Sequence, residues 1–508
     1  MNLIHKTTNL LVTGLITAAL VVVPTVTSAN STVSQASAKA VQSIEQKYKA
    51  KGTAAIDDWT LIALSLMGED VQTQKWGGSI HWQKELRARL HTLDLRKTTD
   101  YARFATAIDA SGEDPAQFGE TNLIQRIKDV QLANGKFADS LDGNGQSLIN
   151  AHVWSIIALY VSGEQIPRAK QAKAWLVSKQ LPDGGFQFAT DAKKGGVDMT
   201  AMTLLAFRAL GMSKEEQPVK KALAFLRKEQ KENGGYNEGG VANVESVANV
   251  ISALIAWGEK PEAWKKSGGN TVDNLLSFQK PDGSFGHTKT GPANQIATAQ
   301  AMLGLSDLKR GGTYLFSMRE KSGNRKVNRL YDLEHSHWAY KEIAYLVKNG
   351  FMQGVSSSRM NPDAAVTRAQ FASLLLRAIG EMPVAHPQGM FHDVSSNNWA
   401  APYVEKAAAL GLMQGSNRQF RPNQGITHEE MAVIASRLAA KYGWQKTYTA
   451  GQAVSVEMAK VSGWAQAGVK DLQKKKLLGT TASKSFIPKA GVTRAEAAAL
   501  LYRLLMIR

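Results

Sequence analysis

Two kinds of helical pattern alternate between residues 40 and 310. One kind is nearly all apolar over about a dozen residues, and the other is amphipathic, with apolar positions recurring every three or four residues. The apolar stretches are "DDWTLIALSLMG" (57–68), "DYARFATAIDASG" (100–112), "AHVWSIIALYVSG" (151–163), "DMTAMTLLAFRALG" (198–211), "VESVANVISALIAWG" (244–258) and "NQIATAQAMLGL" (294–305). Buried helices that alternate with amphipathic ones predict two concentric rings. We therefore expect an all-α (α/α)6 toroid over residues 40–310.

A turn motif recurs between these helices. Each copy has a glutamine, then Asn or Asp, a glycine and an aromatic residue, and successive glutamines lie 49, 50 and 49 residues apart. The copies are 131–137, 180–186, 230–236 and 279–285. This period suits one helix pair per repeat. The glycine can end a helix and the aromatic side chain can pack over the next one, so the motif is predicted to be structural.

A different repeat begins near Leu330 and occurs three times. The copies share a Trp-Ala pair and a later threonine, and the tryptophan-to-threonine spacing is 29, 28 and 29 residues. Each copy is predicted to fold as helix, loop, helix, with bounds 330–390, 391–450 and 451–508. Residues 311–329 are basic and rich in Gly and Asn, which predicts a linker.

The N-terminus has the pattern of a signal peptide. Lys6 precedes an apolar run over residues 10–23, and small residues follow. We expect a leader within residues 1–38 that is cleaved after Ala29 or Ala38. The alternative, an uncleaved membrane anchor, would need a run of about 20 apolar residues. No later stretch is long and apolar enough to span a membrane, so an exported protein without a transmembrane segment is predicted.

Composition narrows the chemistry. The chain has no cysteine, which excludes zinc-thiolate sites, thioester bonds and cysteine nucleophiles. The net charge of +18 favours anionic surroundings such as nucleic acid, acidic lipid or a wall polymer, and export argues against nucleic acid as a partner. His335 and His337 form only a weak metal-ligand pair, so no metal and no cofactor is predicted.

The three C-terminal repeats resemble S-layer homology (SLH) domains. The resemblance implies a helical bundle of pseudo-threefold symmetry whose grooves bind the secondary cell-wall polysaccharide, typically through pyruvylated N-acetylmannosamine. It therefore implies a cell-surface protein that is anchored non-covalently to the wall. Residues 331–508 contain 21 Lys and Arg against 12 Asp and Glu, which suits an anionic polymer.

The repeats contain several candidate polysaccharide-binding residues. Threonine followed three residues later by Gln or Glu predicts a capping box at Thr367, Thr427 and Thr493. A cation in the first helical turn is disfavoured by the helix dipole, so an arginine there suggests an arriving carboxylate. Together with the resemblance, this gives Asp332, Gly354, Arg368, Asp393, Gly415 and Arg494 as candidates.

The three grooves are not expected to bind equally. His428 takes the arginine position in the second repeat, and the third repeat lacks the Phe-x-Asp start and has an eroded glycine loop. Trp338, Trp399 and Trp464 are expected in the core.

The toroid repeats resemble the prenyltransferase and squalene-cyclase fold. In that family the glutamine-aromatic motif ties outer helix ends to inner helix starts. Cyclisation needs closely spaced aspartates, but "VDMTA" (197–201) offers only Asp198, and the zinc-dependent relatives use a cysteine that is absent here. The toroid is therefore expected to be a binding or structural module rather than an enzyme, with a terpene cyclase as a remote alternative.

A wall-anchored glycan-active enzyme is the main alternative, ahead of the cyclase. The polar residues near the starts of the inner helices are Asp57, Asp58, Asp100, His152, Asp198 and Glu245. Two carboxylates across a cavity can act as acid and base on a glycoside, and Asp198 with Glu245 is the candidate pair. Capping also selects carboxylates at these positions. Trp59, Tyr101 and Trp154 can stack on sugars or belong to the core.

Overall fold

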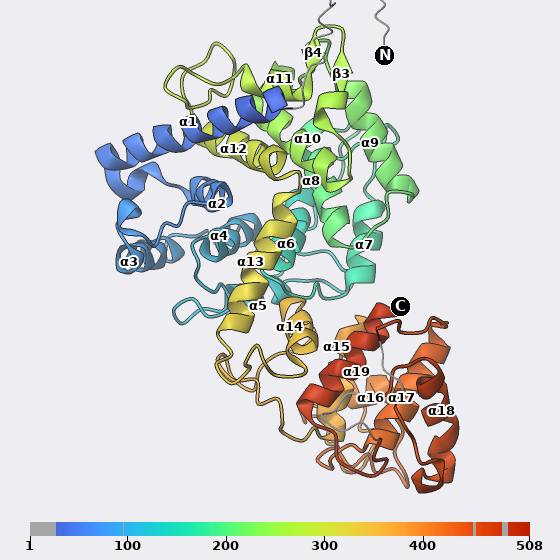
Figure 1. Ribbon diagram of the computed structural model, residues 1–508. Coiled ribbons are helices and arrows are strands. Elements are labelled where there is room, and N and C mark those ends of the chain that lie inside the picture. Colours follow the sequence, from blue (N-terminus) through green and yellow to red (C-terminus); the bar gives the residue numbers. More distant parts are fainter. Residues whose placement is uncertain (1–26, 95, 451–453, 480–485) are drawn as a thin grey trace, which may run out of the picture.

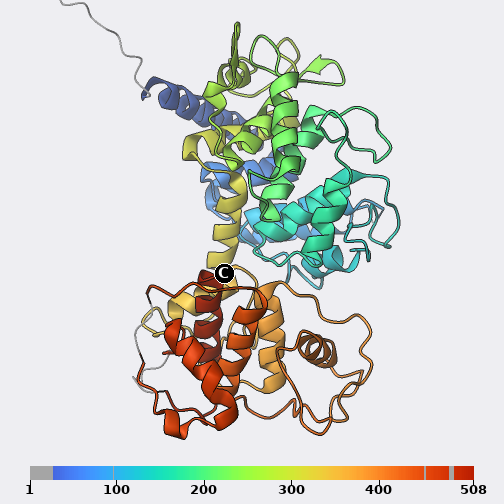
Figure 2. The same ribbon diagram turned by 90° about the vertical axis from the view of Figure 1, so that its right-hand side faces the viewer.

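The computed structural model describes residues 27–94, 96–450, 454–479 and 486–508, and it is almost wholly helical (Figure 1). A ring of helices is followed by a smaller helical bundle, and α13 (Tyr314–Asn328) joins them (Figures 1 and 2). The strands of the described part form two short hairpins, which pair β1 (Asn237–Glu238) with β2 (Val241–Ala242), and β3 (Lys265–Lys266) with β4 (Gly269–Asn270). None of the described helices combines the length and apolar character required to cross a membrane.

The predicted inner ring is present. Each inner helix packs against the next, and the last packs against the first, so the ring closes. The inner helices are α2 (Asp58–Met67), α4 (Thr98–Ala110), α6 (Ile149–Val161), α8 (Val197–Ala209), α10 (Val244–Ala256) and α12 (Gln295–Arg310). Neighbours on both sides and an outer layer bury most of their side chains, which explains their nearly continuous apolar sequence. The all-α (α/α)6 prediction is confirmed.

The outer helices are amphipathic, as expected for a layer with one face in water. They are α1 (Thr27–Lys51), α3 (Ser79–Leu90), α5 (Leu123–Asp129), α7 (Ala169–Val177), α9 (Gln217–Glu229) and α11 (Thr271–Leu276). In α9, for example, Val219, Leu223 and Leu226 are buried while Lys220 and Lys228 are exposed. Helices of this length gain their stability from such packing.

The glutamine of each turn motif ties neighbouring helix pairs together. Gln180 Nε2 donates to the carbonyl of Gly184 in its own turn (2.9 Å) and to that of Pro218 in α9 (2.8 Å). Gln279 closes the ring, because its amide reaches the carbonyl of Ala36 in α1 (2.8 Å). The motif is structural, as predicted, but its glutamine bonds to the next outer helix and not to an inner helix start.

The glycine and the aromatic residue of the motif complete this joint. Gly184 has a φ of +89°, and a Cβ atom there would lie 2.7 Å from the carbonyl oxygen of Lys221. The backbone N–H of the buried Phe186 donates to Thr200 Oγ1 of inner helix α8 (2.9 Å). The turns are thus fixed to the outer ring by their glutamines, and the turns of Phe137, Phe186 and Phe285 are fixed to the inner ring by the backbone N–H of the aromatic residue.

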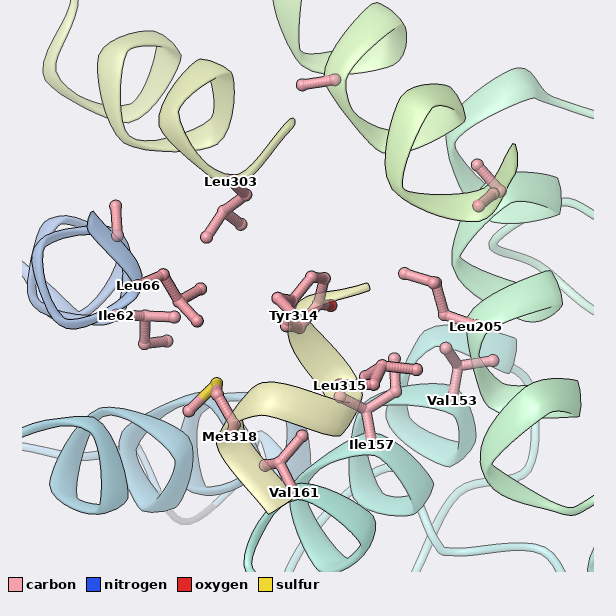
Figure 3. Packing of buried hydrophobic residues seen from close by; sticks show 14 of the residues in the cluster. Ile62, Leu66, Val153, Ile157, Val161, Leu205, Leu303, Tyr314, Leu315 and Met318 are labelled. Atoms are coloured by element: carbon pink, nitrogen blue, oxygen red, sulfur yellow. The ribbon is translucent and has the colours of Figure 1, made fainter. Parts of the chain in front are cut away.

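Residues 311–329, predicted as a linker, instead lie mostly in helix α13. Tyr314, Leu315 and Met318 are buried and point among the inner helices (Figure 3). The glycine that suggested flexibility allows close packing, because a Cβ atom on Gly323 would lie 2.9 Å from Lys348 Cβ of the bundle. The apolar residues were too few in this basic stretch for composition to reveal a helix.

The basic side chains of α13 cap the C-terminal ends of inner helices. The contacts run from Lys321 to the Ser65 carbonyl of α2 (2.7 Å), from Arg325 to the Asp109 carbonyl of α4 (3.2 Å), and from Arg319 to the Tyr160 carbonyl of α6 (2.7 Å). The last carbonyls of a helix lack intrahelical partners and carry partial negative charge. The cations therefore satisfy these carbonyls and complement the helix dipoles at once.

Each repeat contributes two helices to the C-terminal bundle: α14 (Tyr340–Lys348) and α15 (Arg368–Ile379), α16 (Ala401–Ala409) and α17 (His428–Lys441), and α18 (Gln466–Lys474) and α19 (Arg494–Met506). The helices pack between repeats, α15 on α16, α17 on α18 and α19 on α14. The centre of the bundle is a closed cycle of backbone hydrogen bonds. Val366 donates to Val492 (2.8 Å), Val492 to Ile426 (2.9 Å) and Ile426 to Val366 (3.0 Å). The three predicted capping boxes follow directly after this cycle. The cycle gives the bundle its pseudo-threefold arrangement.

The toroid and the bundle meet through a close backbone contact. A Cβ atom on Gly350, after α14, would lie 2.8 Å from the carbonyl oxygen of Gly163, after α6. Arg319 of α13 also bonds to Asn349 Oδ1 (3.3 Å), and Lys170 of α7 pairs with Glu381 of the bundle (3.2 Å). These contacts fix the first repeat against the toroid.

Replacing a motif glutamine should destabilise the ring. Gln230 is buried and donates to the carbonyls of Gly234 (3.2 Å) and Trp264 (2.7 Å). We expect Gln230→Ala to lower the free energy of unfolding by about 1–3 kcal/mol, because the buried Gly234 carbonyl loses its donor and the link to the Trp264 carbonyl is removed. Calorimetric melting against the exposed control Gln46→Ala checks this, and equal melting temperatures would contradict it.

The structure favours one of the two predicted cleavage sites. Residues 1–26 lie outside the part of the chain that the structure describes, but the residues that follow both sites are described. Val33 and Ala36 of α1 are buried against the ring, and the Ala36 carbonyl closes it. Cleavage after Ala38 would remove both residues, whereas cleavage after Ala29 keeps them. We expect the exported protein to begin at Asn30, as measured by mass spectrometry of its N-terminal peptide. A start just after Ala38 would contradict this account.

Candidate functional site

The second helix of the first repeat begins with a buried arginine that holds the loop of the second repeat. Arg368 Nε donates to the carbonyl of Phe420 (2.9 Å), and one terminal nitrogen donates to that of Gln414 (2.8 Å). Its other terminal nitrogen pairs with Glu430 (2.6 Å). Arg368 is therefore a bridge between repeats as well as a cation.

The other two repeats use the same position in the same way. Arg494 of the third repeat donates to the carbonyls of Met360 (2.8 Å) and Gln353 (2.7 Å) in the first repeat. His428 of the second repeat places Nδ1 3.0 Å from the Ile487 carbonyl of the third. The predicted binding residues Arg368 and Arg494 thus first serve to connect repeats in a cycle.

The helix amides predicted to receive an anion are already paired. The backbone N–H groups of Arg368 and Ala369 donate to the carbonyls of Gln424 (2.9 Å) and Pro422 (3.1 Å) in the next repeat. The starts of α17 and α19 are closed in the same way. A carboxylate can therefore be met by side chains at these helices, and not by their first amides as expected.

The two candidate aspartates hold the loops that they precede. Asp393 accepts the backbone N–H groups of Phe420 (2.8 Å) and Arg421 (2.6 Å), and Asp332 accepts the two equivalent amides of its own repeat. Burial raises the pKa of both carboxyls, but these donors outweigh it and hold each pKa below its usual value. Both aspartates are therefore charged loop anchors at neutral pH.

A cavity of about 490 Å³ opens beside Arg368 of the first repeat, against the loop of the second repeat. Its walls come from the loop 413–424, helix α17 and Trp464. Arg368, Arg421 and Arg437 line it, against the single carboxylate of Glu430. The excess of guanidinium groups gives this groove a positive potential and suits it to an anionic ligand.

The candidate glycines shape the loops around this surface. Gly415 lines the groove, and a Cβ atom there would lie 2.5 Å from the carbonyl oxygen of Gln419. Gly354 is equally confined, because its Cβ would lie 2.4 Å from the carbonyl oxygen of Arg359. Any side chain at either position would force the loop to change its conformation.

Arg437 is a groove residue that the sequence-based candidates missed. It lies on the exposed side of α17 and makes one long hydrogen bond, to the Leu412 carbonyl (3.3 Å). It follows His428 by nine residues, and the same interval separates Arg368 from Arg377 and Arg494 from Arg503. Aligning the repeats at that position would have identified it.

The prediction that the three repeat tryptophans lie in the core is wrong. Trp338, Trp399 and Trp464 are 41%, 59% and 60% exposed. The tryptophan-to-threonine spacing identifies the repeats, but it does not say whether a side chain meets a neighbour or a groove. Trp464 lines the groove that holds Arg437, so an open aromatic face lies beside a free guanidinium group.

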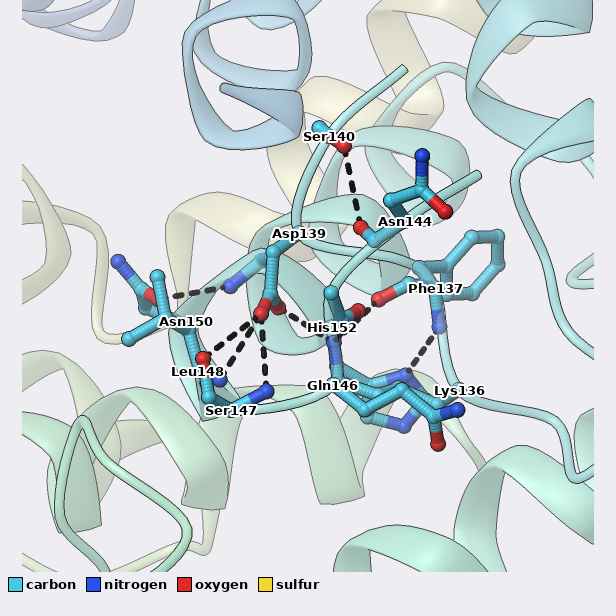
Figure 4. Close-up of polar contacts among 12 residues, drawn as sticks. Lys136, Phe137, Asp139, Ser140, Asn144, Gln146, Ser147, Leu148, Asn150 and His152 are labelled. Carbon is cyan, nitrogen blue, oxygen red and sulfur yellow. Dashed lines mark hydrogen bonds and ion pairs between the residues drawn. The ribbon is translucent and has the colours of Figure 1, made fainter. Parts of the chain in front are cut away.

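Most of the polar candidates in the toroid have structural partners. Asp57 caps α2, and Asp58 and Asp100 pair with Arg103 at 3.1 and 3.2 Å. His152 is buried and accepts the backbone N–H of Phe137 (3.1 Å), as Figure 4 shows. Burial lowers the pKa of His152 to about 3, so this histidine is neutral. These residues support the fold.

Asp198 and Glu245 differ from that group. Burial raises the pKa of Asp198 to about 6, and the nearby carboxylates of Glu238 and Glu245 add to the rise. Asp198 Oδ1 has no hydrogen-bond partner among the described residues. Glu245 accepts from His287 Nδ1 (2.9 Å). The structure thus brings the predicted pair into one acidic cluster at the start of α8 and α10.

The aromatic candidates divide between core and ring mouth. Tyr101 is buried, whereas Trp59 and Trp154 are partly exposed and meet edge to face with ring centroids 5.0 Å apart.

The described part of the chain contains no group of three or more side chains that could together hold a metal ion.

Comparisons with known proteins match both halves of the chain. The S-layer homology domain matches residues 329–372, 391–432 and 458–498. The prenyltransferase alpha-alpha toroid domain matches residues 59–236, and the squalene-hopene cyclase C-terminal domain matches residues 186–307. These ranges agree with the bundle and the ring described above.

Relatives and solved structures share only parts of the chain. The amylopullulanase of Thermoanaerobacterium thermosulfurigenes is 32% identical over 169 residues, which are 33% of this chain and 9% of that protein. The surface-layer 125 kDa protein of Lysinibacillus sphaericus is 34% identical over 111 residues, 21% of this chain and 9% of that protein. Candida albicans protein geranylgeranyltransferase-I has a TM-score of 0.42 and 10% identity, covering 56% of this chain and 98% of that one.

The chain therefore joins a toroid of the prenyltransferase and squalene-cyclase type to three S-layer homology repeats, as an exported protein held at the cell-wall surface.

Proposed function

We propose that the SLH bundle binds an anionic secondary wall polysaccharide, and that the groove beside Arg368 is its principal site. The proposal is carried by one observation: three guanidinium groups and an exposed tryptophan line a single cavity with one carboxylate. Sugar rings pack on aromatic faces, and guanidinium groups bind carboxylates with fixed geometry. A polysaccharide that carries acidic substituents, such as a pyruvyl ketal, offers both partners.

The predicted binding residues take different roles in this account. Arg437 and Arg421 meet the acidic group, and Trp464 supports the neighbouring sugar ring. Arg368 adds positive charge at one side of the groove and also holds the loop 413–424. Gly415 allows this loop its tight course, and Asp393 holds the end of the loop at Phe420 and Arg421. In the groove between the third and first repeats, Arg494, Gly354 and Asp332 act in the same way.

The grooves are proposed to differ in affinity. Where the third repeat supplies the loop, His428 replaces the arginine and pairs with Glu496 (3.2 Å). Arg503, the counterpart of Arg437, bonds to the carbonyls of Leu477 (3.4 Å) and Gly479, and is largely withdrawn from solvent. Both side chains that would face a ligand in that groove are thus bonded within the protein, which supports weak binding there.

The toroid is proposed to serve as a binding or structural module at the wall surface. Helix α13 inserts Tyr314, Leu315 and Met318 among the inner helices (Figure 3), which closes one end of the ring. The single aspartate of "VDMTA" leaves a terpene cyclase with no supporting run of acids.

A second candidate function is glycan cleavage at the other end of the ring. Asp198, with its raised pKa, has the character of a general acid, and the neighbouring Glu245 carboxylate offers a base or nucleophile. The amylopullulanase among the relatives is consistent with glycan chemistry at such walls.

Removing the free arginine of the groove should weaken binding. We expect Arg437→Ala to raise the Kd for purified wall polysaccharide roughly ten- to hundredfold, because a hydrogen bond to a charged partner is worth about 1.5–3 kcal/mol. Lys446→Ala removes the same charge from an exposed site outside the groove and serves as the control. Titration calorimetry measures both, and equal losses would indicate nonspecific attraction instead of a groove.

The toroid carboxylates are tested on the same walls. We expect no release of soluble sugar ends when the protein is incubated with purified wall glycans, whether it carries wild-type residues, Asp198→Asn or Glu245→Gln. Release that both substitutions abolish, and that falls as the pH rises through about 6, where Asp198 loses its proton, would establish the second candidate instead.

A further inference from the structure

A second cavity lies at the junction of the toroid and the bundle. It has a volume of about 360 Å³ and is formed by the toroid loop 114–122, the end of α13 and the first SLH repeat. Its lining includes polar side chains from both halves of the chain: Gln117, Asn122, Arg329, Gln353, Ser356 and Ser357. None of the matched domains contains both walls of this cavity, because one wall belongs to each half of the chain.

Buried ion pairs hold the walls of this cavity in place. Glu164 after α6 pairs with Lys326 of α13 (2.5 Å) and Lys128 of α5 (2.7 Å). Burial raises the pKa of Glu164, but the two lysines outweigh it and bring that pKa to about 2. Arg329 pairs with Asp114 of the toroid loop (2.6 Å). The ion pairs therefore connect the toroid loop, α5 and the end of α13 around the cavity.

The lining of the cavity has the chemistry of a carbohydrate site. The side-chain amides of Gln117 and Gln353 make no hydrogen bond to any residue that the structure describes, and both are exposed. Amide and hydroxyl groups can each donate and accept, which matches the hydroxyl groups of a sugar. Charge is nearly balanced here, in contrast to the three arginines beside Trp464.

The cavity shares a loop with a groove of the anchor. The loop at Gln353 and Gly354 lines the cavity on one side, and its Gln353 carbonyl accepts the Arg494 guanidinium from the other. The groove between the third and first repeats and this cavity therefore lie on the two sides of one loop.

We propose that the junction cavity is an additional carbohydrate subsite, in which the toroid loop 114–122 binds neutral sugars of the wall polysaccharide next to the anchor groove. This inference rests on the proposed function of the bundle. It gives the toroid a direct share in wall binding, and it predicts that the protein prefers a longer stretch of polymer than three SLH repeats alone would occupy.

The test compares two fragments of purified wall polysaccharide, one of a single repeating unit and one of several, by titration calorimetry on the full chain. We expect Gln117→Ala to lower the affinity for the long fragment about three- to tenfold and to leave the short fragment unaffected. Gln117→Trp, which fills the cavity, should lower it further. The exposed Gln46→Ala is the matched control.

The outcomes separate this inference from the proposed function. If the wild-type protein binds both fragments equally, or if the Gln117 variants bind the long fragment as the wild type does, the subsite is refuted and the anchor stands. If the wild-type protein binds neither fragment, both the proposed polysaccharide binding by the SLH bundle and the subsite are refuted.

Discussion

The contact between the cations of α13 and the C-terminal ends of the inner helices sets the architecture of the whole protein. Several helices end at one side of the ring, where unpaired carbonyls and aligned dipoles accumulate negative potential. Lys321, Arg319 and Arg325 meet that potential from one helix, and Tyr314 and Met318 of the same helix enter the ring beside them. Toroid and bundle are thereby joined by a packed helix.

This constraint also decides which positive charges are available for a ligand. The basic segment around α13 is occupied by helix ends and by Glu164, so it is not a site for an external anion. Arg368 and Arg494 are partly occupied as well, since each holds a neighbouring loop. Arg437 and Arg421 remain open to solvent, beside an exposed tryptophan, and they concentrate the usable charge in one groove.

The sequence was sufficient for the features that depend on local pattern. The inner helices followed from their apolar stretches, and the capping boxes at the repeat threonines followed from spacing alone. Features that depend on tertiary packing could not be predicted from the sequence. Helix α13 has the composition of a linker because its cations serve other helices, and the tryptophan spacing could not reveal that Trp464 faces a groove. The first amides of α15 are closed by the carbonyls of Pro422 and Gln424, which only the packing of repeats brings near.

We propose that the SLH bundle holds this protein to the wall through a polysaccharide. Co-sedimentation of the full mature chain with purified walls, before and after extraction of the secondary polysaccharide, tests this attachment. The protein is expected to pellet with intact walls and to stay in solution with extracted ones. Equal sedimentation with both would contradict it and would place the attachment on another wall component.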